Sequence, residues 1–435
     1  MINKYICFIS ALIAASMLMA NGQPADSAMT IKMSAAQEAV QTLVSDPVFS
    51  QAVLSISITT GNGEPLAAYN PNTMVVPASN MKLITTGAAI HTLGKDFRFE
   101  TQLGYKGQIE NGTLKGNLYI LGGGDPTLGS KDTLATPLEQ TFTQWKQLLE
   151  KEGINNIEGY IIGDGRAFDG MPEDGSWVWE DIGTYFGTGS SALMFYENMQ
   201  SFAVSAGETV GSPVNITPHY PATPWMEFRY DCTTGEKGTG DKLYMYTSDL
   251  APIAEIRGTY GVDRGRKQLD CSNKYAEYTC AVYFADWLKR KGISCSGGAG
   301  DFKFQRGWMT NEPKDSLMII GSTTSPELER IIYTTNHASN NLYAETLLRG
   351  LSREMTGSAS YDSAYVALGD VFKELGVASK GADIQDGSGL SRQNYVSADF
   401  FCRFLEGMMA SPHFEAYTAS LPSPGGNGTL NYNMK

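Results

Sequence analysis

The chain has 435 residues, of which 42% are hydrophobic and 18% charged, and its formal net charge is −13. A chain of this length and composition can bury more than one hydrophobic core and suggests two or three domains, as in a globular and not a disordered protein. The acidic balance and the lack of any run of Lys or Arg argue against a nucleic-acid partner, because phosphate binding needs a basic face.

Residues 1–22 have the pattern of a secretory signal peptide. Lys4 supplies a positive start, residues 6–20 form an apolar run, and small residues near its end offer a cleavage site. The alternative is a membrane anchor, but a spanning helix needs about 20 apolar residues and this run is shorter. No later segment is long and apolar enough to compete. We therefore expect an exported, periplasmic protein with no stable membrane span.

The residues that follow the signal predict a helix, a hairpin and a second helix. Residues 33–43 have the spacing of an amphipathic helix, and alternating residues around a Gly-Asn-Gly turn at 61–63 predict a β-hairpin. A further helix opens near Pro77 and ends at Gly94.

The middle of the chain has a different pattern. Short strands with Gly and Asn-Gly turns are predicted over residues 97–121, and residues 163–298 are predicted to be mostly β. Between these parts, Thr136 and Glu139 form a predicted capping box for a helix. The predicted buried face of this helix comprises Leu138, Phe142, Trp145 and Leu149.

Helical periodicity returns after residue 324, where Ser325 and Pro326 are the predicted N-cap and first residue of a helix. Further helices are predicted at about 341–351, 361–375 and 398–409. Helices thus gather at both ends of the chain and strands in its middle. We therefore predict an α/β (α+β) domain made of residues 23–96 and 322–435, with a large, mostly β inserted region at residues 97–321.

Five cysteines follow the predicted signal. An odd number in an oxidising compartment leaves at least one free thiol, and Cys402, in a helical apolar pattern, is predicted to be buried. The other four are candidates for two disulfides of unassigned connectivity: Cys232, Cys271, Cys280 and Cys295. Their spacing does not form a metal-site pattern, so no metal site is expected.

Ser79 and Lys82 are the first candidate pair for chemistry. Residues three apart at the start of a helix lie on the same face, so the hydroxyl and the amine can meet. The free N–H groups and the positive end of the helix dipole favour an oxyanion at Ser79 and disfavour a charged Lys82. The alternative is a surface Ser cap followed by a solvated Lys.

Ser339 and Asn341 form the second candidate group, in a polar loop between two apolar helices. A hydroxyl at Ser339 can relay a proton between Lys82 and a leaving amine, and the Asn341 amide can hold both a substrate carbonyl and the lysine. The alternative is that Ser339 starts the next helix, since Ser is among the commonest N-cap residues.

Two glycine-rich segments are not assigned a chemical role. Residues 122–126 resemble a phosphate-binding loop only in glycine content, because no Gly-Lys-Ser/Thr follows. Residues 386–390 (Asp-Gly-Ser-Gly-Leu) do not form the Gly-x-Ser-x-Gly elbow of α/β-hydrolases, since the second glycine comes one position too soon.

Ser-x-x-Lys opening a helix, followed later by Ser-x-Asn between helices, is the signature of penicillin-binding proteins and serine β-lactamases. Residues 123–128, 386–392 and 421–430 further resemble segments of the D-alanyl-D-alanine carboxypeptidase/endopeptidase family, the class C low-molecular-mass penicillin-binding proteins. The resemblance covers nearly the whole chain after the signal. It implies a catalytic domain interrupted by a second domain that itself contains a third, at about residues 165–270.

The resemblance also implies an activity and residue roles. Ser79 would be the acylated nucleophile and Lys82 the general base of a transpeptidase-like domain, with Ser339 as proton relay and Asn341 as substrate contact. The substrate would be peptidoglycan peptide stems ending in D-Ala-D-Ala, and β-lactams would be covalent inhibitors. Neither a cofactor nor a metal is implied.

The third motif of that family, Lys-Thr/Ser-Gly on a strand that completes the oxyanion hole, does not occur in this sequence; Lys237-Gly-Thr-Gly has the wrong order. We expect that the chain stops before this motif. Two other functions stay open. A serine β-lactamase or esterase is disfavoured by the insertion and by the lack of an identifiable deacylation base, whereas a non-catalytic wall-binding protein is favoured by the absent motif.

Overall fold

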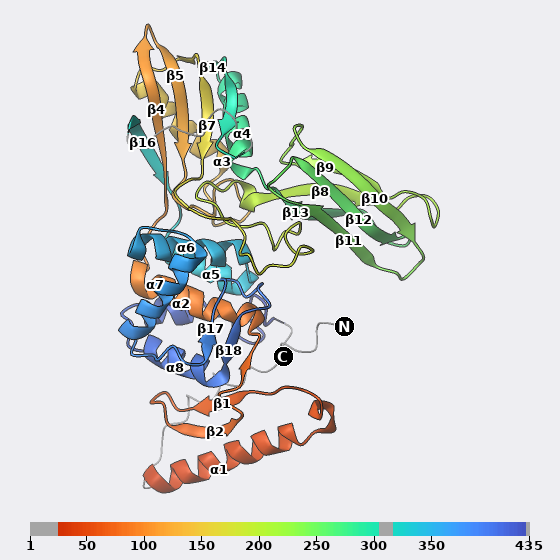
Figure 1. Ribbon diagram of the computed structural model, residues 1–435, viewed down its shortest axis with the longest axis vertical. Coiled ribbons are helices and arrows are strands. Elements are labelled where there is room, and N and C mark those ends of the chain that lie inside the picture. Colours follow the sequence, from red (N-terminus) through yellow and green to blue (C-terminus); the bar gives the residue numbers. More distant parts are fainter. Residues whose placement is uncertain (1–24, 304–315, 432–435) are drawn as a thin grey trace.

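Residues 25–303 and 316–431 are described by a computed structural model, so the predicted signal peptide lies outside the described residues. In this part of the chain, no helix is long and apolar enough to cross a membrane. Figure 1 shows a helix with a hairpin at one end, a cluster of helices in the middle, and a mixed sheet with a β-rich arm at the other end.

The predicted first helix and hairpin are confirmed. Helix α1 (Ala25–Val44) packs against β2 (Pro65–Tyr69), which pairs antiparallel with β1 (Ile56–Thr59). A short 3-10 turn (Pro47–Phe49) lies between α1 and β1. Helix α8 (Ala398–Met408) packs on β1 and joins the hairpin to the helix cluster.

The helix cluster is built around α2 (Met81–Leu93), which follows a 3-10 turn (Ala78–Asn80). The helices around α2 all come from the other end of the chain: α5 (Leu328–Ala338), α6 (Asn341–Thr356), α7 (Tyr361–Glu374), α8 (Ala398–Met408) and α9 (Phe414–Ala419). Beside them, three short strands form a sheet in the order β17 (Ala382–Asp383), β18 (Tyr395–Ser397) and β3 (Met74–Val75).

Helix α2 is buried on almost every side because its residues are apolar or small. Met81, Ile84 and Ile90 have no exposed surface and belong to one core with residues of α5–α9. Gly87 permits the closest packing, since a Cβ there would lie 2.9 Å from the ring of Phe404. The start of α2, and with it Lys82, is thereby fixed in the centre of the cluster.

The inserted region begins with a mixed seven-stranded sheet. Its central hairpin is antiparallel, and β16 adds antiparallel to β4, while β6 and β7 run parallel to β5. The strands are β4 (Glu100–Glu110), β5 (Thr113–Leu121), β6 (Asn156–Ile157), β7 (Tyr160–Asp164), β14 (Ser294–Cys295), β15 (Gly298–Asp301) and β16 (Met318–Thr324). Helices α3 (Leu138–Lys151) and α4 (Ala276–Arg290) pack together against it.

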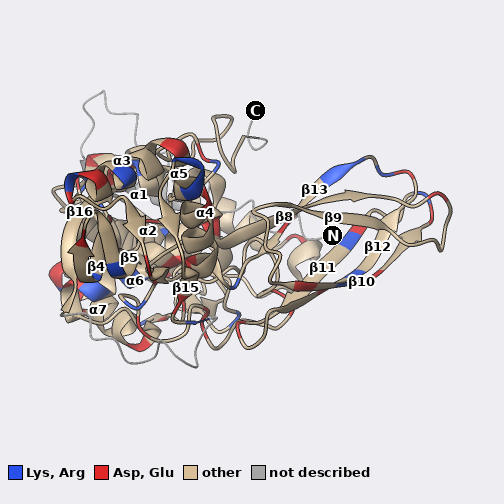
Figure 2. Ribbon diagram, turned by 90° about the horizontal axis from the view of Figure 1, so that it is seen from above, with Lys and Arg blue, Asp and Glu red and all other residues tan. Residues whose placement is uncertain are grey.

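Two three-stranded sheets form the arm, which projects from the rest of the molecule in both views (Figures 1 and 2). The two sheets share a separate core. One has the order β13 (Lys267–Ser272), β8 (Met199–Ser205) and β9 (Asn215–Tyr220), and the other β10 (Glu227–Gly235), β12 (Ile253–Gly261) and β11 (Asp241–Thr247).

Residues 168–198, which we call the β7–β8 segment, run from the sheet back to the helix cluster. The Arg349 guanidinium on α6 donates to the carbonyl oxygens of Asp169 and Ser190, at 2.6 and 2.5 Å. The indole of Trp177 donates to the Asp386 carboxylate at 2.8 Å. A short 3-10 turn (Tyr196–Asn198) ends the segment. The inserted region therefore contacts the helix cluster at several points.

Three predictions about local structure are wrong. Helix α3 begins at Leu138 with Pro137 at its N-cap, which lacks a capping side chain, so the predicted capping box does not form. Helix α5 begins at Leu328, because the Ser325 hydroxyl accepts from the Phe99 N–H instead of capping the helix. The predicted disulfides are absent in the described chain, where the cysteines are free thiols: Cys232, Cys271, Cys280, Cys295 and Cys402.

Candidate active site

The Ser79 hydroxyl and the Lys82 amine lie together at the start of α2. Lys82 Nζ is 3.4 Å from Ser79 Oγ. The two residues differ in exposure, because Ser79 is exposed while Lys82 is 3% exposed. A substrate can therefore reach the hydroxyl, whereas the amine is in the protein interior. The alternative of a solvated Lys82 is contradicted by this burial.

Lys82 Nζ has two further partners, both brought from the other end of the chain. It donates to Oδ1 of Asn341 at 2.7 Å and to the carbonyl oxygen of Ser388 at 2.8 Å. Asn341 is the first residue of α6, which contacts α2 along its length. The packing of α2 on α6 thus adds Asn341 to the Ser79–Lys82 pair, so three of the four predicted site residues are in contact.

Burial dominates the electrostatics of Lys82. It lowers the pKa of the amine from 10.5 to about 8, although the carboxylates of Glu345 and Asp386 act in the opposite direction. Neutral amine is therefore available near physiological pH. A lysine with this pKa can accept the proton of a serine hydroxyl, which a lysine of ordinary pKa does poorly.

Ser339 lies in the turn between α5 and α6, two residues before Asn341. It is the C-cap of α5 with φ 53°, in the left-handed region that a non-glycine residue seldom adopts. In the described chain, Ser339 has no hydrogen bond to Ser79 or Lys82. The alternative that Ser339 caps the next helix is wrong, because Asn340 caps α6 by accepting from the Tyr343 N–H at 3.1 Å.

The loop at residues 386–390, which had no predicted role, supplies the Ser388 carbonyl. Gly389 has φ 82°, and a Cβ there would lie 1.8 Å from the carbonyl oxygen of Ala78. Only glycine permits this approach of the loop to the turn that carries Ser79. The Asp-Gly-Ser-Gly sequence signals a tight loop, but it does not reveal which group the loop contacts.

Two buried acids shape that loop, and neither was predicted. Asp386 accepts from the Gly389 and Ser391 N–H groups at 2.8 and 2.6 Å. Glu345, fully buried on α6, accepts from the Gly387 N–H at 3.0 Å and the Ser388 N–H at 2.7 Å. The available signal was the position of Glu345 on the apolar stripe of a helix. A carboxylate that is fully buried there needs partners, because unpaired carboxylates are almost never fully buried.

Glu345 is electrostatically linked to the site. Burial, followed by the charge of Asp386, raises the pKa of Glu345 to about 8, while hydrogen bonds from the loop oppose the rise. Glu345 is one helical turn beyond Asn341 and binds the backbone N–H of the residue whose carbonyl accepts from Lys82. It therefore supports the partner of the lysine without contacting the lysine.

The β7–β8 segment also reaches the site. The carbonyl oxygen of Phe186 accepts from Asn341 Nδ2 at 2.9 Å, and the carboxylate of Glu197 accepts from Asn340 Nδ2 at 2.9 Å. In each of these two hydrogen bonds, the donor and the acceptor residue are more than 140 positions apart in sequence. A backbone carbonyl carries no sequence signature, so only the fold reveals the contact at Phe186.

In residues 25–303 and 316–431, no group of three or more His, Cys, Asp or Glu side chains is placed to hold a metal ion. An exposed hydroxyl next to a buried amine of lowered pKa is the arrangement that a serine enzyme with a lysine as base requires.

Comparison with known proteins agrees with this class. Residues 36–435 match the model of the D-Ala-D-Ala carboxypeptidase 3 (S13) family. The chain belongs to this family, and it is a penicillin-binding serine peptidase, a hydrolase of the D-Ala-D-Ala carboxypeptidase class. The function and enzyme class predicted from sequence are confirmed.

Curated relatives and solved structures are similar over most of the chain. A D-alanyl-D-alanine carboxypeptidase from Actinomadura sp. (strain R39) is 26% identical over 409 residues, covering 89% of this chain and 70% of the relative. A second, DacB from Haemophilus influenzae, is 23% identical and covers 84% and 72%. The crystal structure of penicillin binding protein 4 from Haemophilus influenzae has a TM-score of 0.71 at 22% identity, covering 85% of this chain and 78% of that one. The predicted fold class is thereby confirmed.

Proposed function

We propose that the enzyme cleaves the terminal peptide bond of peptidoglycan stems ending in D-Ala-D-Ala, through an acyl-enzyme on Ser79. The contact of Lys82 Nζ with Ser79 Oγ at 3.4 Å, between a buried amine and an exposed hydroxyl, carries this proposal. The curated relatives named above are D-alanyl-D-alanine carboxypeptidases, which supports the choice of substrate.

In the first half of the reaction, neutral Lys82 accepts the Ser79 proton while Oγ attacks the carbonyl carbon of the penultimate D-Ala. The negative oxygen of the tetrahedral intermediate lies near the free N–H groups at the start of α2, which favour an anion. When the intermediate collapses, the C–N bond breaks and the leaving amine takes up a proton. Terminal D-Ala departs, and the remaining peptide is an ester on Ser79.

Ser339 and Asn341 complete the proposed mechanism. The Ser339 hydroxyl, which precedes Asn341 by two residues, relays the proton from Lys82 to the leaving amine. Asn341 has its Oδ1 on Lys82 and its Nδ2 on a backbone carbonyl, so it holds the base in place and contacts the substrate. A water molecule, deprotonated by the same base, then hydrolyses the ester and restores Ser79.

The proposed setting is the periplasm. The predicted signal over residues 1–22 supports export, and the proposed substrate lies outside the cytoplasmic membrane. Residues 23–96 and 322–435 form the proposed catalytic domain, with residues 97–321 inserted and residues 165–270 as their inner part. The close relation of α2 to helices α5–α9 supports this division, because their apolar residues share one core.

Covalent labelling tests the proposal. Protein made from the complete coding sequence is incubated with fluorescent penicillin, whose reactive carbonyl mimics the scissile amide, and the labelled peptide is mapped. We expect the label on Ser79, and we expect Ser79→Ala to reduce turnover on the order of 10⁶-fold. Asn80→Ala, a change in the same turn that leaves Ser79 intact, is the control. A label on another residue would contradict the assignment.

A further inference from the structure

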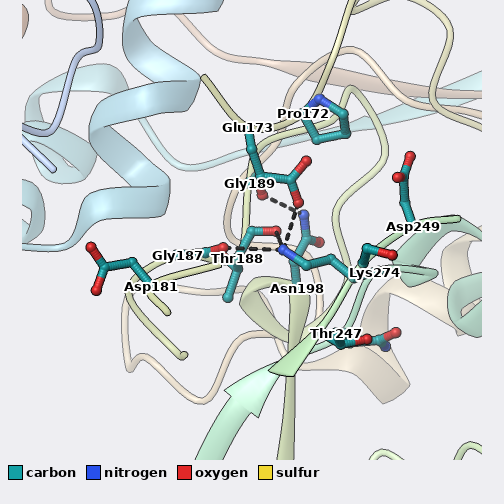
Figure 3. Close-up of polar contacts among 12 residues, drawn as sticks. Pro172, Glu173, Asp181, Gly187, Thr188, Gly189, Asn198, Thr247, Asp249 and Lys274 are labelled. Carbon is teal, nitrogen blue, oxygen red and sulfur yellow. Dashed lines mark hydrogen bonds and ion pairs between the residues drawn. The ribbon is translucent and has the colours of Figure 1, made fainter. Parts of the chain in front are cut away.

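A second buried lysine, Lys274, lies in the turn between β13 and α4, outside the site described above. Its side chain is 1% exposed. The ammonium donates to the Glu173 carboxylate at 2.5 Å and to the carbonyl oxygens of Gly187 and Thr188 at 3.1 and 3.4 Å. Figure 3 shows these groups converging on the Lys274 nitrogen. Burying an ammonium group is costly, so this arrangement calls for an explanation.

Lys274 holds the β7–β8 segment at two places, by the ion pair with Glu173 near its start and by the hydrogen bonds to the carbonyls of Gly187 and Thr188. The next carbonyl along the chain, that of Gly189, accepts from Asn198 Nδ2 at 3.0 Å (Figure 3). Three successive carbonyls, at residues 187–189, thus accept from the side chains of Lys274 and Asn198. This part of the segment has its backbone fixed by side chains, not by a helix or a sheet.

The fixed carbonyls directly follow Phe186, whose own carbonyl accepts from Asn341 Nδ2 at 2.9 Å. This bond determines how the Asn341 amide is oriented. With Nδ2 facing Phe186, Oδ1 faces Lys82 Nζ at 2.7 Å. An amide turned by 180° would instead present its NH₂ group to the lysine, as a donor facing a donor. The position of the 186–188 backbone therefore affects the partner of the proposed base.

We propose that Lys274 is a positioning residue for the active site: by holding the backbone after Phe186, it fixes the Asn341 amide and, through that amide, the Lys82 amine. The inference rests on the proposed function, because it assigns Lys82 the role of base. It extends that function by making the inserted region necessary for acylation. A displacement of about 1 Å at a reacting group costs on the order of 10²-fold in rate, so a modest movement of the loop is enough to matter.

The test is the pH profile of acylation by fluorescent penicillin, measured on full-length wild type and Lys274→Met at a temperature where both are folded. We expect the rate at the optimum to fall 10- to 100-fold, on the order of what a small misplacement costs. We also expect the acid limb to move to lower pH. Loss of the Asn341 acceptor destabilises the charged form of Lys82 and so lowers its pKa. Loss of the distant positive charge of Lys274 alone would raise that pKa and move the acid limb to higher pH.

A double-mutant cycle with Asn341→Ala separates this role from general stabilisation. If Lys274 acts through Asn341, Lys274→Met should reduce acylation by no more than about 3-fold in the Asn341→Ala background, since coupled residues are not additive. Arg166→Met is the matched control. It breaks another ion pair of the inserted region, with the buried Asp164 carboxylate at 2.7 Å, and should give equal effects in both backgrounds.

The outcomes are distinguishable. An unlabelled wild-type Ser79 would contradict the proposed function itself. If wild type is labelled and Lys274→Met melts at a lower temperature but keeps the wild-type rate and acid limb, the positioning role is overturned. Additive effects of Lys274→Met and Asn341→Ala would overturn it as well. If Lys274→Met does not fold, the double variant Lys274→Met/Glu173→Leu leaves no unpaired charge and is judged by the same criteria.

Discussion

The helix cluster and the inserted region each bury one lysine, and each lysine has three oxygen neighbours. Around Lys82 the neighbours are a hydroxyl, an amide oxygen and a backbone carbonyl. Around Lys274 one of the three is the Glu173 carboxylate, at 2.5 Å. The carboxylates near Lys82, those of Glu345 and Asp386, are instead bound to backbone N–H groups of the neighbouring loop.

This difference determines what each lysine can do. Burial lowers the pKa of both lysines, and for Lys274 the Glu173 carboxylate opposes it. The Lys274 and Lys303 ammonium groups in turn hold the pKa of Glu173 below its ordinary value, although burial acts to raise it. A lysine paired with a carboxylate keeps its proton and serves as a structural cation. A lysine with neutral partners can release its proton and act as a base.

The largest expected effect comes from changing the proposed base. Lys82→Arg should be nearly as damaging as Lys82→Ala, with acylation lowered on the order of 10⁴-fold or more, because arginine keeps the charge but cannot act as a base. Stopped-flow acylation with a chromogenic β-lactam measures both variants. Near-normal acylation in Lys82→Arg would mean that only a positive charge is needed at this position. Lys274→Arg, the same change at the other buried lysine, is the matched control.

Removing each lysine charge should affect stability in different ways. Lys274→Met leaves the buried Glu173 unpaired and should lower the free energy of unfolding by about 3–5 kcal/mol. Lys82→Met removes an amine whose burial is unfavourable below its pKa. A pKa lowered from 10.5 to about 8 corresponds to a cost of up to about 3 kcal/mol at pH 7, which the lost hydrogen bonds partly offset. Lys82→Met should therefore be close to wild type at pH 7.

The sign of the pH dependence checks that explanation. Between pH 8 and 10.5, the unfolded chain binds more protons at Lys82 than the folded chain does, so wild-type stability should rise with pH in this window relative to Lys82→Met. Urea unfolding at pH 7 and pH 10 measures the change. If Lys82→Met loses as much stability as Lys274→Met at pH 7, the two lysines do not differ as we infer.

The smallest expected effect concerns the acids around Lys82. Wild-type acylation should rise with pH through about 8, where the pKa of Lys82 lies. Glu345→Gln removes a group whose ionised form raises this pKa, so the acid limb should move to lower pH, with a rate loss of about 10-fold from the weakened loop. Glu354→Gln, at an exposed position on the same helix, should leave the profile unchanged. A limb that moves to higher pH would contradict the linkage.

Sequence was sufficient for the parts of the site that depend on local spacing. Ser79 and Lys82 are three residues apart at a helix start, so the helix itself brings them together, and Asn341 was found by a motif of side chains. Helices with strong apolar periodicity, such as α3 and its buried Phe142 and Trp145, were also predictable.

The remaining parts of the site depend on backbone groups and long-range packing. The carbonyls of Phe186 and Ser388 act through atoms that every residue has, so no side-chain pattern marks them. Glu345 and Lys274 look like ordinary charged residues until burial is known. The disulfide prediction failed for a related reason, because counting cysteines does not show which thiols meet in space.

The separation of the contacts around Lys82 has a consequence for the order of folding. The amine meets Asn341 across 259 residues and Ser388 across 306 residues, so its surroundings come from chain that is synthesised much later. Contacts of such high sequence separation form slowly, after local helices. Until they form, Lys82 is hydrated and has the basicity of a free lysine, and Ser79 lacks an effective base. We therefore expect the proposed nucleophile to be inactive in the nascent chain and to become reactive only when folding brings the two ends together.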